Sequence, residues 1–195
     1  MNIRYNNRKR FLICAIAMGV TCFVTFLLMI HNELTPLGSS SLAAFDCKIQ
    51  YLDFFNYYKD VLTGHNRIGY SLTKGLGGNG VGLFSYYLAS PLNLLMYFFD
   101  GTQANTVIDL LIFIKIGLAA AACAYFLQVR LYDRLSPFFT VLLSTGYGLM
   151  HYSFANASNL MWLDGMFLLP LMMLGTHLVV RRRSLALRKF FRNAK

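Results

Sequence analysis

The chain has 195 residues and a formal net charge of +10, and 56% of its residues are apolar whereas only 13% are charged. A soluble domain has about a quarter of its residues charged, so this composition excludes a water-soluble globule. The positive charge does not indicate a nucleic-acid partner either, because the basic residues gather beside long apolar runs, as they do at the cytoplasmic ends of membrane helices.

The first apolar run follows a basic segment, 1–10, that we expect in the cytoplasm. Residues 11–30 contain no charged side chain, and their 20 residues match the length that a helix needs to cross about 30 Å of hydrocarbon. The run is too long for the core of a signal peptide, and no cleavage site follows it. We therefore predict an uncleaved first transmembrane helix over 11–30.

Residues 31–106 are predicted to form an extracytoplasmic loop. In its first half, polar residues recur at steps of three and four, which places them on one face of a helix lying on the membrane surface. These residues are Asp46, Gln50, Asp53, Tyr57 and Asp60, beside an apolar stripe that includes Phe45, Ile49 and Phe55. The polar face is either merely solvated or carries a general base, one carboxylate that removes a proton from a hydroxyl nucleophile.

A glycine-rich stretch, SLTKGLGGNGVG, follows in the loop. It contains the G-x-G-x-x-G pattern, but no strand precedes it and it faces away from cytoplasmic nucleotides, so we reject a dinucleotide site. Gly77, Gly78 and Asn79 lie at its centre. The glycines either let the backbone approach a ligand or lipid headgroup closely, or only make the loop flexible.

The remaining apolar runs decide the topology. The run at 83–99 is short and has Pro91 in its middle. The longer runs are predicted to be transmembrane helices at 107–128, 137–154 and 160–180, and a basic tail follows at 181–195. With four crossings, 13 of the 18 Lys and Arg lie inside with both termini, whereas a fifth would move the basic tail outside. We therefore predict an all-α membrane protein with four transmembrane helices, and 83–99 as a juxtamembrane helix.

Two ionisable residues in the predicted helices indicate a site. Lys115 lies about 12 Å into its helix, where a charge is costly, so it needs a partner. That partner is either Asp164 or a lipid-linked phosphate from the outer leaflet. Asp109, near the outer end of its helix, is interpreted as structural. No residues have the spacing of a zinc site or a disulfide framework, and we expect no cofactor. A divalent metal stays open, with His31 and Glu33 as its candidate ligands.

Four stretches carry a family resemblance: FDCKIQYLDFF, SLTKGLGGNGVGLFSYYLASPLNLLMYFF, LLIFIKIGLAAAACAYFL and NLMWLDGMFLLPLMMLG. Over about 40–180 the chain resembles the N-terminal part of the YfhO family of bacterial multi-spanning membrane proteins. Members are similar to GT-C glycosyltransferases and are associated with glycosylating cell-surface polymers such as lipoteichoic acid, using an undecaprenyl-phosphate-linked sugar outside the cell. The resemblance thus implies a multi-pass protein of the bacterial cell membrane.

The resemblance also implies roles for individual residues. Asp46 would be the catalytic acidic residue, Gln50 and Tyr51 would belong to the same motif, and Lys115 and Asp164 would line the same outer cavity. The implied partners are a polyprenyl-phosphate-linked sugar, a cell-surface polymer as acceptor, and membrane lipids. Full members continue for several hundred residues, so we expect this chain to be a fragment or a short member. The alternative is a non-catalytic membrane subunit, a scaffold or a carrier of lipid-linked sugars.

Overall fold

The computed structural model describes residues 7–45, 47–72, 77–131 and 134–193, with side chains as far as Arg182, and it is mostly helical. Within these residues three helices are long and apolar enough to cross a membrane: α1 (Asn7–His31), α4 (Ala104–Arg130) and the first 23 residues of α7 (Leu160–Asn193). They coincide with the apolar runs predicted at 11–30, 107–128 and 160–180.

The apolar run at 137–154 forms two helices, α5 (Pro137–Gly148) and α6 (His151–Ala155). The Ser136 side chain caps the start of α5 by accepting from the Phe139 backbone N–H. At the other end, the Ser153 hydroxyl donates to the Gly148 carbonyl at 2.7 Å, a buried contact that satisfies a group left open where the helix ends. With 12 residues, α5 is about 18 Å long, too short to cross by itself. The fourth crossing stays a prediction.

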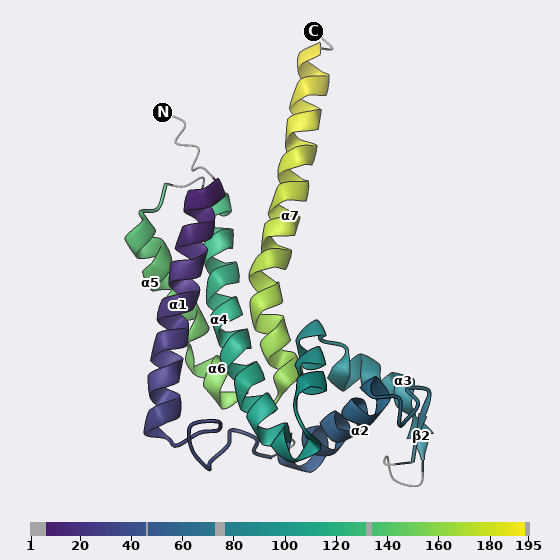
Figure 1. The fold of residues 1–195 in the computed structure, drawn as a ribbon. Coiled ribbons are helices and arrows are strands. Elements are labelled where there is room, and N and C mark those ends of the chain that lie inside the picture. Colours follow the sequence, from purple (N-terminus) through teal and green to yellow (C-terminus); the bar gives the residue numbers. More distant parts are fainter. Residues whose placement is uncertain (1–6, 46, 73–76, 132–133, 194–195) are drawn as a thin grey trace.

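The long helices form one bundle (Figure 1). Helix α4 is central and contacts α1, α5 and α7, and α1 also contacts α5. The beginning of α1 and the end of α7 lie at one end of the bundle, and the elements of the loop lie at the other (Figure 1).

The loop is built from short elements at that opposite end. In chain order these are η1 (Cys47–Tyr51), α2 (Leu52–Leu62), strands β1 (Tyr70–Ser71) and β2 (Gly78–Asn79), α3 (Gly80–Leu83), η2 (Phe84–Leu88), η3 (Pro91–Phe98) and η4 (Gly101–Gln103). The strands form an antiparallel hairpin. The single helix predicted over 83–99 is interrupted at Ala89 and Ser90, directly before Pro91, whose ring cannot continue a helix begun earlier.

The buried face of the first loop helix differs from the predicted one. Phe45 and Ile49, assigned to the apolar stripe, are 82% and 73% exposed, whereas Tyr57, assigned to the polar face, is buried. The face that packs inward carries Cys47, Tyr51 and Tyr58 together with Phe55, which the period predicted. Asp53 and Asp60 are exposed, as predicted. The errors at Phe45 and Ile49 lie before and within the π-helical turn of η1, where a strict 3.6-residue period does not apply.

The loop elements share one core with the bundle. Tyr51 and Phe55 from the first loop helices and Leu88 and Met96 from the later ones are buried in one cluster with residues of α4 and α7: Val107, Ile108, Leu111, Leu160 and Leu163. Burial of this apolar surface holds the loop against the outer half of the bundle. The loop is therefore an integral layer of the fold.

Gly148 provides a test of the bundle packing. A Cβ there would lie 3.1 Å from both the Ile116 carbonyl oxygen and Thr21 Cγ2, whereas Gly146 on the same helix has nothing within 4 Å. We expect Gly148→Val to lower the free energy of unfolding by about 1–3 kcal/mol through overpacking. Gly146→Val is the matched control and should change it much less. Thermal unfolding of both variants in one detergent, followed by circular dichroism, makes the comparison, and equal losses would contradict the packing.

Candidate functional site

A buried ion pair joins α4 to α7. The Nζ atom of Lys115 lies 3.0 Å from Oδ1 of Asp164, and the Lys115 side chain is 0% exposed while that of Asp164 is 18% exposed. The same ammonium donates to the Leu160 carbonyl oxygen at 2.9 Å. Of the two partners that the sequence left open for Lys115, a carboxylate or a phosphate, the structure shows the carboxylate.

Asp164 also connects the pair to the loop. The Ser90 hydroxyl, in the break between η2 and η3, donates to Oδ1 of Asp164 at 3.1 Å. One carboxylate oxygen thus accepts from both α4 and the loop, which compensates for its partial removal from water. This contact explains why the helix at 83–99 is broken where it is: the chain turns toward α7 at Ser90.

A groove of about 540 Å³ opens beside Asp164. We call it the Asp164 groove; it lies between the η2–η3 segment on one side and α4 and α7 on the other. Its walls are mostly apolar and aromatic, with Asp164 and Ser90 among its polar groups; other lining residues are Tyr86, Tyr87, Leu118, Met161, Phe167 and Leu168. Lys115 does not line the groove and lies behind Asp164. A site with a small polar region and long apolar walls suits an amphiphilic ligand.

The residues of η1 reach this groove through Tyr87. The Tyr87 hydroxyl donates to Oε1 of Gln50 at 2.9 Å, and the Tyr87 and Tyr51 rings meet edge to face with centroids 5.1 Å apart. Tyr51 itself is buried, with its hydroxyl beside the Met161 backbone, and burial raises the pKa of that hydroxyl. The structure therefore places Gln50 and Tyr51 next to the wall of the Asp164 groove.

Tyr87 and Ser90 are two site residues that the sequence analysis did not assign. Both lie in the YYLASP stretch, within the most specific part of the family resemblance. Their contacts with Gln50 and Asp164 join residues 37 and 74 positions apart, and no local pattern indicates such pairs. The sequence could have found them only through that motif.

Asp46 lies outside the described residues, but its neighbours are described. Phe45 has a positive φ of 48° and a largely exposed side chain, whereas Cys47 is fully buried at the start of η1. Burial, and to a smaller extent the negative charge of Asp109, raise the pKa of the Cys47 thiol to about 12. That thiol is therefore protonated and chemically inert at neutral pH.

Gly77, Gly78 and Asn79 do not line the Asp164 groove. Gly78 and Asn79 form β2, at the far side of the loop elements from α7 (Figure 1), and the Asn79 side chain caps α3 by accepting from the Val81 backbone N–H at 2.9 Å. Gly77 has φ +111°, and a Cβ there would collide with the Tyr70 hydroxyl. Gly77 thus meets a requirement of the backbone, because a side chain fits neither this φ nor this space. In the described part of the chain, no three His, Cys, Asp or Glu side chains gather as a metal site would require.

The ion pair predicts a specific pattern of stability. Lys115→Met leaves the Asp164 carboxylate without its ammonium, so we expect a loss of about 1–3 kcal/mol, less than for a fully buried pair because Asp164 is partly exposed. Replacing both residues, as in Lys115→Met with Asp164→Leu, should restore most of that loss because no charge remains unpaired. Unfolding of the two variants in detergent tests this, and a Lys115→Met protein as stable as the parent would contradict the pairing.

Comparison with known proteins places the chain in a family. The family model described as bacterial membrane protein YfhO matches residues 17–188. No curated protein and no solved structure matches the chain. The matched range contains the Lys115–Asp164 pair, the Asp164 groove and η1, together with the second and third long apolar helices and the latter part of the first. This chain accordingly belongs to the YfhO family of bacterial membrane proteins.

Proposed function

We propose that this chain is the N-terminal part of a GT-C-like glycosyltransferase of the bacterial cell membrane. It would transfer a sugar from a polyprenyl-phosphate carrier to a hydroxyl of a cell-surface polymer such as lipoteichoic acid. The observation that carries this proposal is the Asp164 groove, where apolar walls end at a carboxylate and a hydroxyl beside the Gln50–Tyr51 motif. The apolar walls suit an isoprenoid chain, and the carboxylate and hydroxyl suit a sugar.

The polar groups of the groove suit the sugar better than the phosphate. Asp164 can accept hydrogen bonds from sugar hydroxyls, whereas its negative charge repels a phosphate. Lys115 is fully buried behind it and already donates to Asp164 and to Leu160. The geometry therefore supports a role for Lys115 in fixing Asp164, in place of the direct contact with the leaving phosphate that the sequence suggested.

The chemical step in this proposal takes place at Asp46. Its carboxylate removes the proton from the acceptor hydroxyl, the oxygen attacks the anomeric carbon, and the bond from that carbon to the phosphate oxygen breaks. The polyprenyl phosphate leaves with the electron pair of that bond. Asp46 directly precedes η1, whose Gln50 and Tyr51 contact the groove wall, so the motif and the groove are close in the fold.

One observation favours the alternative of a non-catalytic subunit or carrier of lipid-linked sugars. Lys115 is fully buried and bonded to both Asp164 and the Leu160 carbonyl oxygen, as a purely structural residue would be. In that case the groove holds a lipid-linked sugar for a partner enzyme, and no carboxylate in the loop affects turnover.

The two functions differ in the effect of Asp46→Asn. A positioned general base contributes about 10²- to 10⁴-fold in rate, so we expect a loss of that size in sugar on the surface polymer. Asp53→Asn and Asp60→Asn, exposed on α2 about two and four turns further on, are matched controls and should leave transfer nearly normal. The variants are made in the intact polypeptide and compared at equal protein levels. Undiminished transfer by Asp46→Asn would favour the non-catalytic alternative.

The proposed orientation places the loop outside the cell and both termini in the cytoplasm. In a variant without the four native cysteines, we expect a membrane-impermeant maleimide to label Val81→Cys in intact cells, because Val81 is exposed on the loop. Asn193→Cys, in the basic tail, should be labelled only after the cells are permeabilised. Labelling of both positions in intact cells would contradict four crossings.

A further inference from the structure

All hydrogen bonds that the Asp109 carboxylate accepts come from the beginning of the loop. It lies in the second turn of α4 and is 1% exposed. Oδ2 accepts from the Thr35 hydroxyl at 2.6 Å, and Oδ1 accepts from the Ser41 hydroxyl at 3.0 Å and from the Leu42 backbone N–H at 2.9 Å. A carboxylate bonded in this way fixes the segment that supplies the donors.

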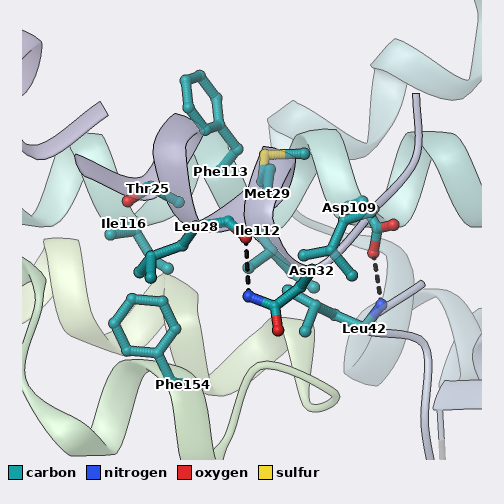
Figure 2. A pocket seen from close by; sticks show the side chains of 11 residues that line it. Thr25, Leu28, Met29, Asn32, Leu42, Asp109, Ile112, Phe113, Ile116 and Phe154 are labelled. Carbon is teal, nitrogen blue, oxygen red and sulfur yellow. Dashed lines mark hydrogen bonds between the residues drawn. The ribbon is translucent and has the colours of Figure 1, made fainter. Parts of the chain in front are cut away.

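The surroundings of Asp109 make these bonds necessary. Figure 2 shows it at one end of a cavity of about 400 Å³ between α1, α4 and α6, with its carboxylate directed at the backbone of Leu42. Most of the cavity wall is apolar, including Met29, Phe113 and Phe154. A carboxylate removed from water in such a place needs several donors, and losing them costs much more than one ordinary hydrogen bond.

The hydrogen bonds continue from Asp109 to the start of η1. The Ser41 hydroxyl accepts from the Ala43 backbone N–H at 3.0 Å, the Leu42 carbonyl accepts from the Ala44 N–H at 2.8 Å, and the Ala44 carbonyl accepts from the Cys47 N–H at 3.0 Å. The Cys47 thiol also lies close enough to Asp109 for that charge to raise its pKa. Asp109 is thus connected to the chain on both sides of position 46.

We propose that Asp109 is a positioning residue, which through Thr35, Ser41 and Leu42 fixes the segment that carries Asp46 at the outer end of α4. This inference rests on the proposed function, in which Asp46 is the base. A base must lie within hydrogen-bond reach of the proton that it removes, and a displacement of 1 Å costs about 10²-fold in rate. Asp109 is not itself the base, because its carboxylate is buried and bonded to protein donors.

Cys47 provides a reporter of the anchoring that is independent of catalysis. It is fully buried, so a maleimide reaches it only when the segment detaches from α4. The experiment uses a protein in which Cys47 is the single cysteine, with Cys14, Cys22 and Cys123 replaced by Ala. Its readouts are the labelling rate of Cys47 in membranes and the sugar on the surface polymer when the same changes are made in the intact polypeptide.

We compare Asp109→Leu with the conservative Asp109→Asn. Leu removes every acceptor, so we expect Cys47 to be labelled at least about tenfold faster and transfer to fall by about 10- to 100-fold. Asn keeps one oxygen for Ser41 and Leu42, and its amide can donate to the Thr35 hydroxyl, so both values should stay within about threefold of the parent. A residue needed for its charge would instead lose transfer equally in both variants, and this result would overturn the proposal.

If Cys47 in Asp109→Leu stays protected from the maleimide and sugar transfer is normal, the anchoring by Asp109 is overturned. Fast labelling of Cys47 with unchanged transfer would instead overturn the placement of the chemistry at Asp46, and with it the proposed function. If Asp109→Leu does not accumulate, Thr35→Val with Ser41→Ala removes two of the three donors and leaves α4 unchanged. Its control is Thr35→Ser, which keeps the hydroxyl, and a double variant in which Cys47 stays protected would equally overturn the anchoring.

Discussion

The buried pair of Lys115 and Asp164 determines how the rest of the molecule is arranged. An ammonium in the middle of an apolar helix has to be paired, and the pair that satisfies it fixes the first turns of α7 against the middle of α4. That contact places Met161 opposite the tyrosines of η2, and the space between them is the Asp164 groove. The Ser90 hydroxyl of the loop donates to the same carboxylate, so Asp164 contacts both the bundle and the loop.

The long helices were predictable because a membrane leaves a strong signal in the sequence. A run of about 20 apolar residues has few other interpretations, and α1, α4 and α7 follow from it directly. The division of 137–154 left no such signal, since the apolar residues Leu149 and Met150 continue through the break, where the Ser153 hydroxyl donates to the Gly148 carbonyl five residues earlier. The π-helical turn of η1 left no signal either, and a regular period placed Phe45, Ile49 and Tyr57 on the wrong faces.

For the site, the sequence identified charges but could not identify their hydrogen-bond partners. Lys115 and Asp164 stand out because ionisable residues are rare in apolar runs. Asp109 stood out for the same reason, yet its donors lie 67 to 74 residues earlier in the chain and follow no periodicity. The glycines left two interpretations open in the sequence, and at Gly77 the structure shows a positive φ and a close contact with Tyr70 that exclude a side chain.

The two carboxylates at the loop end of the bundle differ in a way that fits different tasks. Asp109 accepts from two hydroxyls and one backbone N–H of the loop and is closed to solvent, so its hydrogen bonds serve to hold the chain. Asp164 is held by Lys115 and remains partly exposed at the groove, where it can still accept from a ligand. Both anchors depend on α4, which carries Asp109 and Lys115. A tilt of this one helix would therefore act both on the beginning of the loop, through Asp109, and on Asp164, through Lys115.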